Sequence, residues 1–239
     1  MRAKAILFDL FDTLLLIEQG ELFYKPSLAE LHQFLVKNGI DVSFVEFSRA
    51  YTEARERLYA DAAENLGEPH FNLRVQRALQ SLGYSFGPSD EIVVGATAAF
   101  CEEFTRYVRM ERNVVQVLEQ LHSEYRLGIV SNFAIPECVQ KLLKKFGLER
   151  FFDVVVVSGA INKRKPSPEI FTKALASLGV EASETVFVGD TLDVDVLGAK
   201  NAGMKTVFVE RRAQKGMGRA RPDWTIKSLN ELSASLGHW

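Results

Sequence analysis

The sequence predicts an α/β protein with a doubly wound, parallel-sheet (Rossmann-like) core and a smaller all-helical domain. Short apolar segments recur along the chain, and a helical pattern follows each of them. Their apolar residues are consecutive rather than alternating, which is typical of a sheet covered on both faces. Alternating strands and helices of this kind favour a parallel, doubly wound sheet. One long stretch, from about residue 17 to about residue 110, has helical patterns and no convincing strand.

The core elements are expected in a regular order. The strand-like segments are KAILFDLF (4–11), YRLGIVSN (125–132), FFDVVVVSG (151–159), TVFVGD (185–190) and MKTVFVE (204–210). A helix is expected over 135–147, with Pro136 in its first turn and Gly147 at its end. Another is expected over 167–179, capped by Ser167 and ended by Gly179. The segment 221–237 resembles a short strand and a closing helix.

The helical stretch interrupts the core after its first strand. Its first helix is predicted to open at a capping box of Ser27 with Glu30 and to stop at Gly39. We therefore expect a core formed by residues 1–16 and 110–239, and an inserted helical domain over 17–109. The aromatic residues of this domain are expected to lie mostly in its core. Tyr24 and Lys25 are the best candidates to face a ligand, because they follow the first strand.

Composition limits the classes of function. The 239 residues include 29 basic and 31 acidic ones, a net charge of −2, so no overall field attracts nucleic acid or an anionic membrane. A basic stretch from Arg211 to Arg221 lacks interleaved aromatics and is expected to be a solvated loop. Cys101 and Cys138 build no disulfide framework and are expected to be small core residues. Without an apolar leader or membrane span, a cytoplasmic protein is expected.

Polar side chains stand where the predicted strands end. Asp9 ends the first strand, Ser131 and Asn132 the second and Asp190 the fourth, while Lys165 follows the third. Ligands of doubly wound sheets bind at the carboxyl ends of the strands. Any one of these residues alone is more simply a cap or a turn former. Because polar residues follow all four strands at the same edge, the sequence predicts a single site there.

The predicted site suits phosphate chemistry. Two carboxylates can hold Mg²⁺ through hard oxygen ligands, and a carboxylate is a competent nucleophile for phosphoryl transfer. Ser131, Asn132 and backbone amides can bind the oxygens of the phosphoryl group. Lys165 supplies the balancing positive charge.

Four ordered motifs resemble those of the haloacid dehalogenase-like hydrolase superfamily: FDLFDTL, VSN, KRKPSPEIF and VGDTLDVDVLGAKNAGM. The resemblance covers residues 4–14 and about 110–230, and the helical insertion corresponds to the family's cap. It implies that Asp9 is the nucleophile. It also implies that Asp9, Asp190 and the carbonyl oxygen of Phe11 hold Mg²⁺. Ser131 and Lys165 would bind phosphate, and Asp195 would orient metal-bound water or Lys165.

Phe11 departs from the family pattern. Phosphatases of the family usually carry a second aspartate, a general acid and base, two residues after the nucleophile, whereas the haloacid dehalogenases lack it. Dehalogenation by Asp9 is therefore a real alternative. Against it, the acidic Asp190 is retained, and no arginine lies between Asp9 and Ser48, where the dehalogenases use one. Asp12 is expected to stabilise the turn rather than to replace the missing acid, and Thr13 to hold the loop near Asp9.

The function predicted from these residues is a Mg²⁺-dependent phosphatase of a small phosphorylated metabolite, acting through an aspartyl-phosphate. A chain that binds a phosphometabolite without efficient turnover is the second alternative, after dehalogenation. It is disfavoured because Asp9, Ser131, Lys165 and Asp190 are all retained. Neither nucleic acid nor membrane is an expected partner, and no motif indicates an oligomeric state.

Overall fold

A single parallel sheet of six strands forms the core of the computed structural model, which describes residues 3–18, 20–211 and 220–236. Most of the basic stretch predicted to be a solvated loop lies outside these residues. The strand order is β5-β4-β1-β6-β7-β8, and every neighbouring pair is parallel. The strands are β1 (Ala5–Phe8), β4 (Arg126–Ser131), β5 (Val154–Val157), β6 (Thr185–Gly189), β7 (Lys205–Val209) and β8 (Trp224–Ile226). The predicted doubly wound parallel sheet is confirmed.

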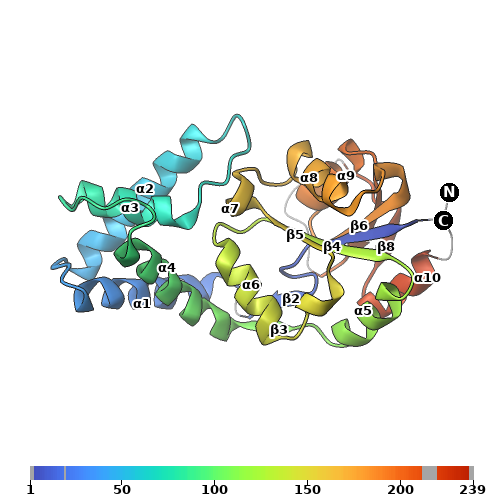
Figure 1. Ribbon diagram of the computed structural model, residues 1–239, viewed down its shortest axis with the longest axis horizontal. Helices are drawn as coiled ribbons and strands as arrows, with labels where there is room; N and C mark the ends of the chain where they lie inside the picture. Colours follow the sequence, from blue (N-terminus) through green and yellow to red (C-terminus); the bar gives the residue numbers. More distant parts are fainter. Residues whose placement is uncertain (1–2, 19, 212–219, 237–239) are drawn as a thin grey trace.

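Helices cover both faces of the sheet (Figure 1). Alternate residues of β1 point to opposite faces, so Ile6 and Phe8 join one buried cluster while Ala5 and Leu7 join another. The first cluster packs the sheet against α5 (Val114–His122), α6 (Pro136–Lys145) and α10 (Leu232–Leu236). The second packs it against α8 (Pro168–Leu178) and α9 (Leu197–Asn201).

The predicted ends of two core helices are confirmed. Helix α6 begins at Pro136, and Gly147 adopts a positive φ of 65° just beyond its end. Ser167 caps α8 by accepting a hydrogen bond from the amide of Glu169, and Gly179 ends the helix in the left-handed conformation. Proline suits the first helical position because its missing N–H would have no partner there.

Four of the α-helices between β1 and β4 in the chain stand to one side of the sheet (Figure 1). They are α1 (Tyr24–Lys37), α2 (Phe44–Asp61), α3 (Phe71–Ser81) and α4 (Glu91–Phe104), which we call the helical segment. Helix α1 packs mainly on α4, and α2 on α3. Aromatic and aliphatic residues at helical spacing form its interior, among them Leu31, Phe47, Tyr51 and Phe71.

The start predicted for the first of these helices is wrong. Helix α1 already begins at Tyr24, and Ser27 lies inside it, where its buried hydroxyl donates to the carbonyl oxygen of Phe23 (2.8 Å). A serine bonded to the carbonyl four residues earlier does not cap the helix. In the helical segment, a capping box joins Ser43 with Glu46 at the start of α2.

A second, two-stranded sheet was missed by the sequence prediction. The strands β2 (Leu15–Ile17) and β3 (Val108–Met110) pair in antiparallel fashion, where the chain leaves the core and where it returns. Three-residue strands are too short to show a period in the sequence. Their pairing brings the two ends of the helical segment side by side.

The two cysteines also differ from expectation. Cys101 of α4 and Cys138 of α6 form a disulfide, with their Cα atoms 5.7 Å apart, so the prediction of two separate core thiols is wrong. Both residues are buried, as expected, but the packing of α4 against α6 brings them into bonding distance. The disulfide ties the helical segment to the core. Within the described residues, no helix is long and apolar enough to cross a bilayer.

The short remaining elements connect these layers. They are the α-helical turn α7 (Ser158–Ile161), the 3-10 turns η1 (Gly20–Phe23), η2 (Thr105–Tyr107), η3 (Glu149–Phe151), η4 (Ala182–Glu184) and η6 (Leu229–Glu231), and the π-helical turn η5 (Leu192–Val196).

Candidate active site

Three neighbouring strands end in polar side chains at one edge of the sheet. Asp9 follows β1, the central strand of the three, while Ser131 ends β4 and Asp190 follows β6. Strands β4 and β6 both pair with β1 in parallel, so their carboxyl ends meet at this edge. All three side chains are buried. The structure therefore brings together the strand-end residues that the sequence singles out.

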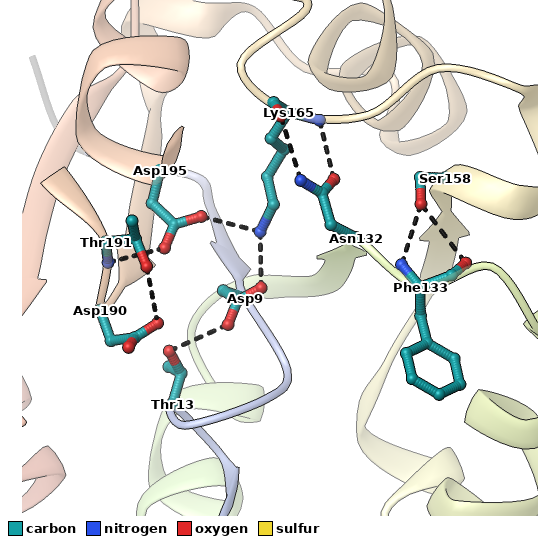
Figure 2. Close-up of polar contacts among 9 residues, drawn as sticks. All are labelled: Asp9, Thr13, Asn132, Phe133, Ser158, Lys165, Asp190, Thr191 and Asp195. Carbon is teal, nitrogen blue, oxygen red and sulfur yellow. Dashed lines mark hydrogen bonds and ion pairs between the residues drawn. The ribbon is translucent and has the colours of Figure 1, made fainter. Parts of the chain in front are cut away.

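Lys165 reaches this edge from the loop before α8 (Figure 2). Its ammonium nitrogen lies 2.5 Å from a carboxylate oxygen of Asp9 and 2.8 Å from one of Asp195. The side-chain amide of Asn132 holds the backbone of Lys165 on both sides. Its oxygen accepts from the Lys165 amide (2.7 Å), and its nitrogen donates to the Lys165 carbonyl (3.0 Å). Asn132 thus positions Lys165.

The carboxylates of Asp9, Asp190 and Asp195 form a compact acidic cluster, with one oxygen of each within 4.8 Å of the others. Asp195 is held in place by the backbone amide of Thr191, which donates to it (3.0 Å), and the Thr191 hydroxyl lies 3.4 Å from Asp190. Asp195 sits in the π-helical turn η5, a rare element that is frequent at functional sites. Gly189 lets Asp195 pack there, since a Cβ at residue 189 would lie 2.5 Å from its carboxylate.

Burial dominates the electrostatics of this cluster. It raises the pKa of Asp9 from 3.8 to about 7; Lys165 lowers this pKa, and Asp195 and Asp190 raise it. Burial by itself would lower the pKa of Lys165, but the carboxylates of Asp195 and Asp9 raise it above its usual value. Three clustered acids against one ammonium leave an excess of negative charge. This donor set, all oxygen, fits a hard divalent cation such as Mg²⁺.

Ser131 has a buried hydroxyl with no hydrogen-bond partner among the described residues. A buried polar group without a partner is costly, so such a group in a native structure indicates a ligand or water. The loop after it is fixed from outside, because the Ser158 hydroxyl accepts from the Phe133 amide (2.9 Å). Thr13 donates its hydroxyl to the second oxygen of Asp9 (3.2 Å). An anion bound at Ser131 would give its hydroxyl an acceptor, and Lys165 would supply positive charge nearby.

Phe11 and Asp12 lie in different surroundings. The ring of Phe11 packs against Phe133 (centroids 4.9 Å apart) and against Phe104 of α4 (5.8 Å). Asp12 adopts a positive φ of 59°, and its carboxylate accepts from the amide of Ile17 (3.3 Å). Asp12 therefore stabilises the turn between β1 and β2, as its sequence context predicts.

Of Tyr24 and Lys25, the two residues of the first helix expected to face a ligand, only Tyr24 lines a cavity. Tyr24 lines a cavity between the helical segment and the core, whereas Lys25 is exposed and is not among the residues of that cavity. The same cavity is lined by three polar residues that the sequence did not single out, Tyr59, Glu68 and Arg74. No local pattern marks them, because they come from two helices and the loop between them.

The sequence and the fold are similar to those of known hydrolases. Residues 51–209 match the model of the family described as haloacid dehalogenase-like hydrolase. A glyceraldehyde 3-phosphate phosphatase of Methanopyrus kandleri is 31% identical, over 96% of this chain and 95% of that protein. Among solved structures, a phosphatase of the same family from Thermococcus onnurineus is 28% identical with a TM-score of 0.63, covering 98% of both chains. A 2-haloacid dehalogenase from Pseudomonas syringae is 26% identical with a TM-score of 0.75, covering 99% of both chains.

Proposed function

Since the chain belongs to the haloacid dehalogenase-like hydrolase family, as a phosphoric monoester hydrolase, we propose that it is a Mg²⁺-dependent phosphatase with Asp9 as its nucleophile. The observation that carries this proposal is the contact of Asp9 with Lys165, next to two further buried carboxylates and the unpartnered hydroxyl of Ser131. A nucleophile, a cation site and anion-binding groups thus stand together.

In the proposed reaction, an oxygen of Asp9 attacks the phosphorus of the ester, and the bond to the leaving oxygen breaks. Water then attacks the phosphorus of the aspartyl-phosphate, which releases inorganic phosphate and restores the carboxylate. Ser131 and Lys165 would stabilise the oxygens of the phosphoryl group, on which charge develops. Thr13 would hold Asp9 in position through its hydrogen bond to the second oxygen.

Asp9, Asp190 and the carbonyl oxygen of Phe11 are the proposed ligands of Mg²⁺. When bound, the ion would neutralise charge between the carboxylate and the phosphate, so that one anion can approach another. Asp195 contacts Lys165 and the amide of Thr191, which supports a positioning role for it. The buried acidic cluster supports a metal at this place.

The helical segment is proposed to act as a cap, with the division at residues 17–109 that the sequence predicts. Its loop before α3 touches the loop that carries Lys165: the amide of Arg164 donates to the carbonyl of Leu66 (2.9 Å). A cap that closes over the site can exclude water until the phosphoryl group has moved. The named relatives support a small phosphorylated metabolite as the substrate. A cytoplasmic location stays a prediction.

Dehalogenation is the second candidate. It is favoured by the phenylalanine at position 11, packed among aromatic rings, and by the fold similarity to a 2-haloacid dehalogenase. A carbon–halogen displacement by Asp9 needs no metal, so the retained Asp190 has no purpose in it. The acidic cluster therefore favours the phosphatase.

A paired assay tests the proposal. Release of phosphate from p-nitrophenyl phosphate and from a panel of phosphorylated metabolites is measured with Mg²⁺ and with EDTA, and release of chloride from L-2-chloropropionate under the same conditions. We expect phosphate release that EDTA abolishes reversibly and that Asp9→Asn eliminates. If chloride is released at the same rate with and without EDTA, the protein is instead a dehalogenase. No turnover of any compound would favour a binding protein.

A further inference from the structure

A pocket of about 150 Å³, partly open to solvent, lies between the helical segment and the core. Its walls are mostly aromatic and come from both units, with Tyr24, Phe71 and Phe100 on one side and Phe133 on the other. A volume of this size equals about five water molecules at roughly 30 Å³ each. The enclosed part has room for a group of a few non-hydrogen atoms, and a larger leaving group can extend through the opening.

The cavity adjoins the proposed phosphate site. Asn132 lines it, and the same side chain is bonded to the backbone of Lys165 on both sides. Ser131 immediately precedes Asn132 in the chain. A substrate with its phosphate at Ser131 and Lys165 would therefore have its leaving group in this cavity.

The part of the lining formed by α2, α3 and the loop between them carries a buried polar cluster. Arg74 is only 5% exposed, and one of its terminal nitrogens donates to the Tyr59 hydroxyl (2.6 Å) and to the Glu68 carboxylate (3.1 Å). Tyr59 also donates to Glu68. The Nε–H of Arg74 is buried and makes no hydrogen bond of normal geometry with a described residue, and the buried Tyr51 hydroxyl is the other polar group that interacts with this guanidinium. A buried charged donor without a hydrogen bond of normal geometry favours an acceptor oxygen beside it.

Positive charge is in excess around this cluster. The guanidinium groups of Arg74, Arg164 and Arg55 lie over the ring of Tyr59, with centroid distances of 4.9, 5.2 and 5.8 Å. Glu68 is a single buried carboxylate among them, and Glu56 is exposed beside Arg55. Burial raises the pKa of Tyr59 to about 12, so its hydroxyl adds no negative charge at neutral pH. An electron-rich oxygen is therefore the group that suits this end of the cavity.

We propose that Arg74 is the residue that recognises the leaving group, by donating to a carbonyl or carboxylate oxygen at the end of the substrate remote from its phosphate. This inference rests on the proposed phosphatase function, and it narrows the substrate to a short phosphorylated carbonyl compound or acid. Arg74 selects the substrate and takes no part in the bond changes at phosphorus.

A matched substrate series tests the inference. Glyceraldehyde 3-phosphate, 3-phosphoglycerate and glycerol 3-phosphate share a three-carbon skeleton and end in a carbonyl, a carboxylate and a hydroxyl. We expect the wild type to prefer one of the first two over glycerol 3-phosphate in kcat/KM. Arg74→Met should lower kcat/KM for the preferred compound by about 10- to 100-fold, the range of a charged hydrogen bond. Turnover of p-nitrophenyl phosphate should stay within a few-fold.

Two further variants separate recognition from folding. Arg77→Met, on the exposed side of the same helix, should leave the ranking of the three compounds unchanged. Combining Glu68→Gln with Arg74→Met avoids leaving a buried carboxylate unpaired. This double variant should lose the preference in kcat/KM among the three compounds, as Arg74→Met does. Its circular dichroism spectrum should remain native. A folded double variant that keeps the wild-type ranking would overturn the inference. Absence of Mg²⁺-dependent turnover of p-nitrophenyl phosphate by the wild type would instead overturn the proposed function.

Discussion

Replacing Asp9 by asparagine should destroy activity and yet raise the stability of the metal-free protein at neutral pH. Asp9 is 7% exposed, and its burial raises its pKa from 3.8 to about 7 despite the contact with Lys165. An amide of the same shape removes the buried charge but leaves Lys165 its partner Asp195 at 2.8 Å. The ionised carboxylate of Asp9 therefore serves the proposed chemistry at the expense of the fold.

The magnitude follows from the pKa difference. A shift from 3.8 to about 7 is roughly 3 pH units, and at about 1.4 kcal/mol per unit it corresponds to about 4 kcal/mol of lost stability at full ionisation. Because the pKa of the folded state is the higher one, this cost is absent below about pH 4. It grows as the pH rises towards 7 and is complete above that value.

Urea unfolding of both proteins in EDTA, followed by circular dichroism at pH 4.5, 6 and 8, measures the difference. The advantage of Asp9→Asn in the free energy of unfolding should be small at pH 4.5 and reach about 1 to 4 kcal/mol at pH 8. Asp61→Asn, at an exposed acid of α2, is the control and should show no such trend. An asparagine variant that is less stable than the wild type at pH 8, or a difference independent of pH, would refute the reasoning.

Three other perturbations test the metal ligands, the disulfide and the residue at position 11. Asp190→Ala should raise the Mg²⁺ concentration needed for half-maximal activity by at least about 10-fold, more than Asp195→Ala does; the opposite order in a Mg²⁺ titration would exchange their proposed roles. Reducing the Cys101–Cys138 disulfide should lower the free energy of unfolding by about 2 to 4 kcal/mol, as measured by urea unfolding with and without dithiothreitol; a double alanine variant should be insensitive to the reductant. Phe11→Asp should accelerate hydrolysis of an alkyl phosphate by about 10²-fold or more relative to p-nitrophenyl phosphate, because a general acid helps a poor leaving group most. An equal change for both esters would exclude that role.

The proposed catalytic residues were accessible to sequence reasoning because of parallel topology. Once the apolar segments are read as neighbouring parallel strands, the residues after them must meet at one edge, as Asp9, Ser131 and Asp190 do. Lys165 could be included because its loop follows the third strand. Local signals likewise located the helix starts, a proline in the first turn for α6 and a capping serine for α8.

What the sequence missed depends on packing between distant segments. The disulfide joins residues 37 positions apart, and the pairing of β2 with β3 joins segments about 90 residues apart. Arg74 was overlooked because an arginine on an amphipathic helix is ordinarily exposed, and only the fold shows that this one is buried beside Glu68. The start of α1 was misplaced because Ser27 has a capping pattern but a buried position.

The most direct test of the central claim, that Asp9 attacks phosphorus, is a search for the phosphorylated protein itself. The enzyme is mixed with excess p-nitrophenyl phosphate and Mg²⁺, quenched in acid within its first turnovers and digested, and the peptide that contains Asp9 is examined by mass spectrometry. We expect this peptide to carry one phosphoryl group that hydroxylamine removes, and to carry none when EDTA replaces Mg²⁺ or in Asp9→Asn. A phosphoryl group on another residue, or turnover of the ester with Asp9 never labelled at any quench time, would contradict the account.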